Sequence, residues 1–117
     1  MTEIRRLHSN ARMSQTVVHG DTVYLAGQIA VDNAGKSITE QTEEVVKRID
    51  DLLAEVGSDK SRILTANLYV ADMSTFGDIN AVWDKWVSAD NKPARTTIEA
   101  KLAAPQYGVE ITVVAAL

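Results

Sequence analysis

The sequence predicts an α+β fold in which two helices pack on one face of a single sheet. Two observations lead to this prediction. Runs of β-favouring residues and two segments of helical periodicity follow each other in the order strand, strand, helix, strand, helix, strand, strand. The length of 117 residues, with 45% hydrophobic and 24% charged residues, fits one compact domain, and we expect residues 1–117 to form it.

The first predicted elements are a hairpin and a long helix. The runs SQTVVH and TVYLAGQI lie between Ser14 and Ile29 and are separated by Gly20-Asp21, a pair suited to a tight turn. A helix is expected to begin at Ser37, because Ser37 and Glu40 have the spacing of a capping box. Its apolar stripe consists of Ile38, Val45, Ile49, Leu52, Leu53 and Val56.

The second half of the chain predicts a strand, a helix and two closing strands. The segment 63–70 is rich in β-formers, and the closing strands follow Pro93 and Pro105. A second helix is expected from about Ser74, and we expect its aromatic residues to pack in the core between helix and sheet. The apolar residues at helical spacing are Phe76, Ile79, Val82, Trp83 and Trp86.

Alternation along the strands predicts which residues face the helices and which do not. The helix-covered set is expected to include Val23, Leu25, Gly27, Ile29, Thr96, Ile98, Ala100, Val109, Ile111 and Val113. The uncovered face is then polar and carries Tyr24, Gln28, Asn67, Tyr69, Arg95, Thr97, Glu99, Glu110 and Thr112. A simply solvated sheet face is one interpretation of this pattern, and a functional surface is the other.

Composition argues against several classes of function. The absence of cysteine excludes disulfides, thiolate nucleophiles and cysteine-bound zinc. A net charge of -4 with scattered basic residues argues against a nucleic-acid partner. No apolar run is long enough for a signal peptide or a membrane span, so we expect a soluble, cytoplasmic protein. His8 and His19 are expected at the surface, before the first strand and at a hairpin turn, and no metal site is predicted.

Arg95 and Glu110 are the candidate chemical groups. The sequence lacks a nucleophile elbow, a phosphate-binding loop and the zinc protease motif. Arg95 begins a strand after Pro93-Ala94, and its guanidinium can form a bidentate pair with a small carboxylate ligand. An ion pair with Glu99 or Glu110 is the alternative. Glu110, beside an electrophilic substrate, can orient water for hydrolysis.

These segments resemble the Rid family, also called the YjgF/YER057c/UK114 family, over residues 12–117. The resemblance is carried by the motifs in their order: VVHGDTVYLAGQI, SITEQT, LTANLYVADMSTFGDINAVW, PARTTIEAKL and GVEITVVAA. It implies a chorismate-mutase-like fold assembled as a homotrimer with clefts between subunits. It also implies hydrolysis of reactive 2-imino and enamino acids to 2-oxo acids and ammonia, without metal or cofactor.

The resemblance assigns roles to residues of matching motifs. Arg95 would hold the substrate carboxylate and Glu110 would position the attacking water, while Asn80 and Thr97 would shape the cleft. Gln28 would line it, together with Met13 and Ala26. The archetypal imine deaminases have tyrosine and serine where this chain has Met13 and Ala26, so the resemblance implies a different subgroup.

Two other functions remain open from the sequence. A homotrimer that binds small carboxylates without turnover would use the same arginine. An endoribonuclease or translation inhibitor would need a basic surface, which a pI of about 5.1 does not favour.

Overall fold

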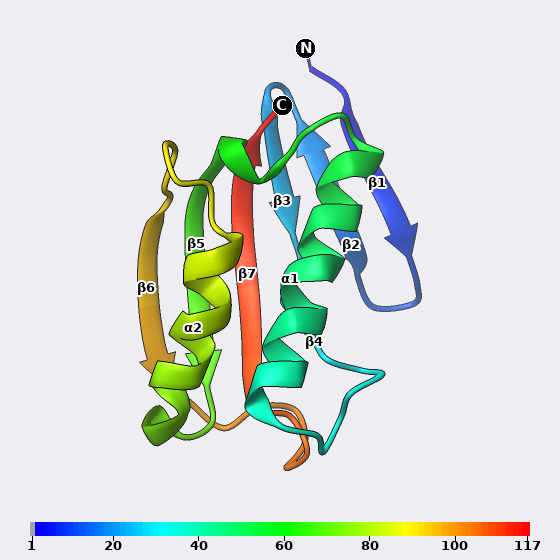
Figure 1. Cartoon of the computed structure of the whole chain (residues 1–117). Helices are drawn as coiled ribbons and strands as arrows, with labels where there is room; N and C mark the ends of the chain where they lie inside the picture. The colour runs from blue at the N-terminus through cyan, green and yellow to red at the C-terminus, as the bar shows by residue number, and fades with distance from the viewer. Residues whose placement is uncertain (1) are drawn as a thin grey trace.

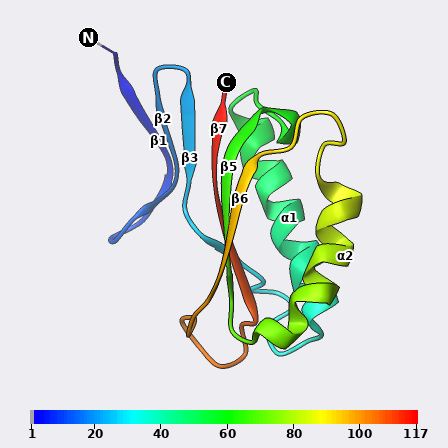
Figure 2. The ribbon, with the colours of Figure 1, turned by 90° about the vertical axis from the view of Figure 1, so that its left-hand side faces the viewer.

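The computed structural model describes residues 2–117 and has one mixed sheet with two helices on a single face (Figures 1 and 2). The predicted α+β fold is therefore confirmed. Short 3-10 turns at Lys60–Arg62 and Met73–Thr75 precede β5 and α2. The elements in chain order are β1 (Ile4–Ser9), β2 (Ser14–His19), β3 (Thr22–Leu25), β4 (Gln28–Ile29), α1 (Ile38–Glu55), β5 (Ile63–Val70), α2 (Phe76–Trp86), β6 (Ala94–Glu99) and β7 (Val109–Ala116).

The last strand of the chain, β7, lies at the centre of the sheet. The strand order is β1-β2-β3-β7-β5-β6, and β4 also pairs with β7. Only β5 and β6 pair in parallel among these neighbours, with α2 as their connection. Figure 2 shows both helices on one side of the strands, so the other side of the sheet, the open face, is left uncovered within the chain.

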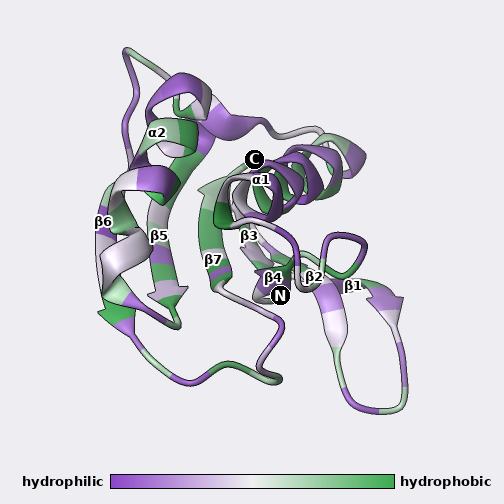
Figure 3. Cartoon of the chain, turned by 60° about the horizontal axis from the view of Figure 1, so that its bottom comes forward, coloured by the Kyte–Doolittle hydropathy of each residue, from purple (hydrophilic) through white to green (hydrophobic). Residues whose placement is uncertain are grey.

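Helix α1 begins at the predicted capping box. The Ser37 hydroxyl accepts a hydrogen bond from the Glu40 N–H at 3.1 Å and donates one to the Glu40 carboxylate at 3.0 Å. Val45, Ile49 and Leu53 are completely buried against the sheet, which stabilises the fold by about 1.5–3 kcal/mol for each side chain. Figure 3 shows the resulting contrast between the hydrophilic outer side of α1 and the hydrophobic β7.

Helix α2 is held to the core by its tryptophans, as the spacing predicts. Trp83 and Trp86 are buried and meet edge to face, with ring centroids 5.3 Å apart. The Trp86 indole N–H donates to both carboxylate oxygens of Asp50 at 3.0 Å, which joins α2 to α1. No helix in residues 2–117 is long and apolar enough to cross a membrane.

Strand β1 is an element that the sequence analysis missed. It pairs antiparallel with β2, so His8 lies in a strand rather than in a segment before the first strand. Its sequence IRRLHS carries little apolar alternation because β1 is an edge strand whose residues are mostly exposed. The sequence of β1 therefore does not predict a strand, and only its backbone pairing with β2 identifies it as one.

The predicted alternation through Gln28 is wrong, because the chain leaves the strand conformation at Ala26 and Gly27. Strand β3 ends at Leu25 and β4 resumes at Gln28. Leu25 and Gln28 are both buried, each 6% exposed, although three positions separate them. The interruption shifts by one residue the alternation of side chains between the two faces of the sheet. Gln28 therefore lies on the helix side, and Ile29 pairs with Glu110 on the open face.

The two faces of β6 are also reversed relative to the prediction. In register, Arg95 pairs with Ala66 and Thr97 with Leu68, and both β5 residues are buried under the helices. Paired residues point to the same face of a sheet, so Arg95, Thr97 and Glu99 lie on the helix side. Ile98, the only large apolar residue of the strand, is 47% exposed on the open face. A hydrophobic pattern assigns the two faces of such an edge strand wrongly, because neither face is fully buried.

Glu44 ties the loop after β4 to α1. Its carboxylate accepts hydrogen bonds from the backbone N–H groups of Asp32 at 3.2 Å and Asn33 at 2.8 Å, and from Arg48 Nε at 2.6 Å. Burial raises the pKa of Glu44, but the hydrogen bonds from Arg48 and the loop backbone outweigh it and hold the pKa below 4.5.

We expect Glu44→Gln to destabilise the protein by about 1.5 kcal/mol at neutral pH. Because the folded pKa lies below the unfolded one, this contribution is complete above about pH 4.5 and is lost as pH falls through the folded pKa. Urea unfolding at pH 7 and pH 3 measures the difference from the wild type, which should shrink at pH 3. The exposed neighbour Glu43→Gln is the control. An equal difference at both pH values would contradict this role of the carboxylate.

Candidate functional site

The structure separates the predicted site residues into two clusters, which also contain three residues not predicted for the site: Phe76, Trp83 and Gly27. The Arg95 cluster consists of Phe76, Asn80, Trp83, Arg95 and Thr97, on α2 and the edge strand β6. The Gly27 cluster consists of Met13, Ala26, Gly27, Gln28 and Glu110, around the interruption between β3 and β4.

The Arg95 guanidinium is held in place by α2. Its Nη1 donates to the Asn80 side-chain oxygen at 2.9 Å. Its central carbon lies 5.3 Å from the Trp83 ring centroid and 5.4 Å from that of Phe76. Both distances are within the range of cation–π contacts, which attract the guanidinium to the ring faces. The side chain is thus positioned before any ligand arrives.

Arg95 does not form the ion pair that the sequence left open. The ion pairs found between residues 2 and 117 join His8 with Glu55, Lys47 with Asp51, and Arg48 with Asp32 and Glu44. Glu99 accepts instead from the Met73 N–H at 2.9 Å. A guanidinium has five N–H donors, so Arg95 keeps donors for a bidentate pair with a carboxylate after its contact with Asn80.

Sequence reasoning treated Phe76 and Trp83 only as core residues. Phe76, Asn80 and Trp83 are spaced i, i+4 and i+7 and therefore share one face of α2. That face carries an amide between two aromatic rings, a pattern that suits an arginine on the strand below. This spacing could have predicted an arginine site on α2, but only if Arg95 had already been placed on the helix side of the sheet.

The Gly27 cluster is built around a close approach between Gly27 and Glu110. Glu110 lies on the central strand β7 and points to the open face, because Val109 and Ile111 on either side of it are completely buried. A Cβ atom added at Gly27 would lie 2.8 Å from the carboxyl carbon of Glu110 and would overlap its oxygen. The missing side chain therefore gives the carboxylate its space.

If Glu110 acts in a hydrolytic reaction, Gly27→Ala should lower the kcat/KM of that reaction by about tenfold or more, which corresponds to about 1.4 kcal/mol of transition-state stabilisation. The new methyl group must displace the flexible Glu110 carboxylate, so stability should change little. Turnover and thermal unfolding of the same samples measure both effects. Gly77→Ala on α2 is the control, because nothing lies within 4 Å of its added Cβ. Full activity of Gly27→Ala would contradict a role for this approach.

The other members of the Gly27 cluster fix the chain around it. The Gln28 amide donates at 2.9 Å to the Gln15 side-chain oxygen and to the Ala26 carbonyl. The Ala26 N–H donates to the Gln15 carbonyl at 2.9 Å. Met13, 40% exposed in the β1–β2 turn, lines a cavity with Gly27 and Gln28. The structure thus places Met13, Ala26 and Gln28 around Gly27, whereas Glu110 approaches Gly27 from the open face.

The histidines lie at the surface and outside both clusters. His8 pairs with Glu55 at 2.9 Å, and His19 is exposed at the β2–β3 turn. In the described part of the chain, no three histidine, aspartate or glutamate side chains are grouped to hold a metal ion.

Arg95 and Glu110 lie on opposite faces of the sheet within one chain. Arg95 is on the helix side at the edge, and Glu110 is on the open face of the central strand. A single ligand therefore does not bridge them across the sheet of one chain.

The fold places the chain among small α+β proteins whose two helices cover one face of a mixed sheet. The chain belongs to the Ribonuc_L-PSP family, also known as the YjgF or Rid family, whose model, described as Endoribonuclease L-PSP, matches residues 3–117. The resemblance seen in the motifs is thereby confirmed.

Relatives match nearly the whole chain. A RutC family protein of Haemophilus influenzae is 44% identical over 112 residues, covering 96% of this chain and 97% of the relative. The RutC family protein YoaB of Escherichia coli is 40% identical over 114 residues, covering 97% and 98%. A crystal structure of a YjgF family member from Neisseria meningitidis superposes with a TM-score of 0.89 at 38% identity, covering 97% and 94%.

Proposed function

We propose that the protein hydrolyses small reactive 2-imino and enamino acids to 2-oxo acids and ammonia, in clefts between the subunits of a homotrimer. Arg95 holds the substrate carboxylate and Glu110 positions the attacking water. Asn80 and Thr97 shape the cleft on one side, and Met13, Ala26 and Gln28 shape it on the other. The reaction needs neither a metal nor a cofactor.

The observation that carries this proposal is the state of Arg95. Its guanidinium is fixed by Asn80 and two aromatic rings, yet its charge is not matched by a protein carboxylate among residues 2–117. A preorganised arginine with free donors is suited to a bidentate pair with a small carboxylate. Every 2-imino acid carries that group beside its reactive carbon.

Glu110 supports the hydrolytic step. Water adds to the C=N carbon of the imine while the carboxylate takes up one water proton and passes it to the nitrogen, which gives a carbinolamine. The carboxylate then takes the hydroxyl proton of this intermediate and passes it to the nitrogen, so that the C=O bond forms, the C–N bond breaks, ammonia leaves and the carboxylate is again ionised. An enamine first takes a proton on carbon to become the imine. The negative charge of Glu110 also stabilises a protonated imine.

Assembly between subunits is supported by the arrangement of the clusters and by the open face. Tyr24 on β3 and Ile98 on β6 are 46% and 47% exposed on that face, where no helix of the chain covers them. A closed threefold ring would cover the same face in every subunit. It would also bring the Arg95 cluster of one subunit to the Gly27 cluster of the next.

The direct test is turnover of an imino acid generated in situ by an amino-acid oxidase. The protein should accelerate its decay over buffer, and Glu110→Gln should remove most of the acceleration. No acceleration with several different imino acids would contradict the proposed reaction. Thermal stabilisation by 2-oxo acids without any turnover would instead identify a non-catalytic carboxylate-binding protein.

The family description includes the word endoribonuclease, and we do not propose that activity here. A net charge of -4 and dispersed basic residues provide no surface for a phosphate backbone. Retention of labelled RNA at about 150 mM salt would contradict this interpretation.

A further inference from the structure

Glu110 lies in a row of four residues that crosses the open face of the sheet. It pairs in register with Tyr69 on β5 and with Ile29 on β4, and Tyr69 pairs in turn with Ile98 on β6. Paired residues point to the same face, so all four side chains are on the open face. The row therefore places a tyrosine hydroxyl and a carboxylate side by side, with an isoleucine at each end.

The Tyr69 side chain packs within this row. It is half-buried, whereas Tyr24 on the same uncovered face is 46% exposed. The Cβ atoms of directly opposite residues in an antiparallel pair lie about 4.5–5.5 Å apart, which is close enough for their side chains to interact. Tyrosine has a longer side chain than glutamate, so the Tyr69 hydroxyl extends further from the sheet than the Glu110 carboxylate. It therefore lies at the level of a ligand that sits above this carboxylate.

The Glu110 carboxylate leans away from Tyr69. It occupies the space beside Gly27, where an added Cβ atom would lie 2.8 Å from the carboxyl carbon. Gly27 connects β3 and β4, which pair with one side of β7, whereas β5 pairs with the other side. A ligand atom above β7 at this point therefore has the carboxylate on one side and the tyrosine hydroxyl on the other.

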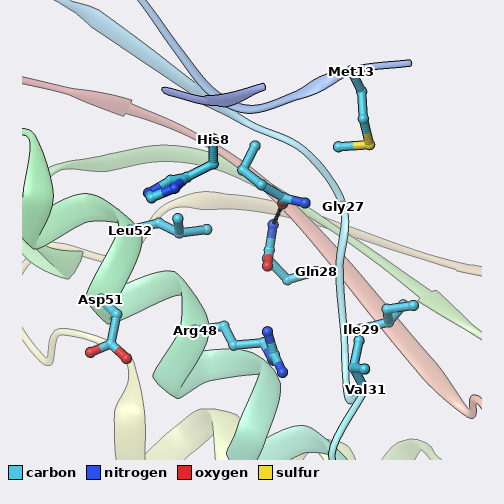
Figure 4. A pocket seen from close by; sticks show the side chains of 10 residues that line it. His8, Met13, Gly27, Gln28, Ile29, Val31, Arg48, Asp51 and Leu52 are labelled. Atoms are coloured by element: carbon cyan, nitrogen blue, oxygen red, sulfur yellow. Dashed lines mark hydrogen bonds between the residues drawn. The ribbon is translucent and has the colours of Figure 1, made fainter. Parts of the chain in front are cut away.

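The neighbouring polar side chains are less well placed to donate to such a ligand. Gln28 is on the helix side of the sheet, where its side chain lines the cavity beside α1 (Figure 4). Asn67 is on the open face but one row further along, where it pairs with Thr112. Diagonal neighbours in a sheet are about 7–8 Å apart, a distance that aromatic and long side chains span and an asparagine does not. The geometry therefore favours Tyr69 as the donor opposite Glu110.

A hydrogen-bond donor at this position would act on the oxygen atom of the hydrolysis. When water adds to the C=N carbon, its oxygen becomes the hydroxyl group of the carbinolamine. Negative charge builds up on this oxygen while the carboxylate takes the hydroxyl proton and the C=O bond forms. A fixed hydroxyl donor stabilises that charge in the same way as the donors of an oxyanion hole. The donor keeps its own proton, so the balance of the reaction is unchanged.

We propose that the Tyr69 hydroxyl donates a hydrogen bond to the oxygen atom of the carbinolamine and to the 2-oxo group of the bound product. This inference rests on the proposed function, since it uses the same Glu110 site, and it adds a catalytic residue to that site. It also gives the protein a means to recognise the 2-oxo group in addition to the carboxylate. A plain carboxylate of the same length lacks this oxygen and gains nothing from the hydroxyl.

The test is Tyr69→Phe, which removes the hydroxyl and keeps the ring. In turnover, kcat should fall about 100-fold with little change in KM, because the imine itself lacks the oxygen. In thermal-shift titrations, the wild type should bind pyruvate about three- to tenfold more tightly than propanoate, and Tyr69→Phe should bind both equally. Tyr24→Phe is the matched control, because Tyr24 is on the same face two rows away, paired with Val114. Thermal unfolding and light scattering of both variants should match the wild type, which separates loss of the hydroxyl from a change in fold or assembly.

The outcomes separate this inference from the proposed function. If no imine is turned over, but Tyr69→Phe removes a preference for pyruvate over propanoate, then the reaction is wrong and the contact between Tyr69 and the 2-oxo group is supported. If imines are turned over and Tyr69→Phe is as active as Tyr24→Phe, then the role of Tyr69 is wrong and the reaction stands. Equal binding of pyruvate and propanoate by the wild type would overturn the inference without any variant.

Discussion

Replacing Arg95 with alanine is expected to abolish detectable imine turnover and 2-oxo acid binding. Loss of one partner of a desolvated, hydrogen-bonded charge pair costs about 2–5 kcal/mol, which is roughly a 30-fold to several-thousandfold loss of affinity. The substrate carboxylate would face Asn80 and two aromatic rings without a matching cation. Kinetics with the in situ imine assay and thermal shift with 2-oxo acids measure the two losses.

Arg95→Lys should recover little of this activity. Lysine keeps the charge, but its ammonium lacks the planar donor fork that pairs with a carboxylate and lies over aromatic rings. Arg5→Ala, an exposed arginine on β1, controls for the simple loss of a positive charge. The structural alternative makes a different prediction. If Arg95→Ala lowers the melting temperature but retains ligand binding, then Arg95 mainly anchors α2 to β6.

The fold was predictable wherever local chemistry and burial agree. The capping box at Ser37, the turn at Gly20 and the alternation along β7 each have a local physical cause, and the structure has all three. The two tryptophans are in the core for the same reason: helical spacing and large apolar area favour the same position.

The faces of the sheet were not predictable where burial is incomplete. In β6 an exposed isoleucine and a half-buried arginine invert the usual hydrophobic assignment, because α2 attracts the arginine through Asn80 and aromatic rings. Between β3 and β4, the interruption at Ala26 and Gly27 moves each later residue of that segment to the face opposite the one predicted. Neither effect has a signature in the period-2 pattern.

The candidate site illustrates the same limit. The candidate residues were proposed from their motifs, but the motifs did not predict how the fold groups them. Sequence reasoning placed Arg95 and Glu110 on one face, whereas the register with β5 places them on opposite faces. A site that needs both groups therefore calls for two chains, and this requirement comes from the backbone pairing rather than from the identity of any residue.

The proposed trimer has a measurable mass. Light scattering should give about three times 12.7 kDa for the purified protein. The open face, with exposed Tyr24 and Ile98, supplies the area to be covered. A stable monomer that still binds 2-oxo acids would contradict both the assembly and the shared site.

Subunit mixing provides the sharper result, because it tests whether one site draws on two chains. Arg95→Ala and Glu110→Gln should each be inactive alone. When the two variants are unfolded together and refolded as an equal mixture, a cleft is intact where Arg95 comes from one variant and Glu110 from the other. Random assembly of a cyclic trimer gives about one quarter intact clefts, so activity should return to about 25% of the wild type. Each variant refolded alone is the control. If both groups serve one site within the same chain, no mixture restores activity, and the shared cleft is wrong.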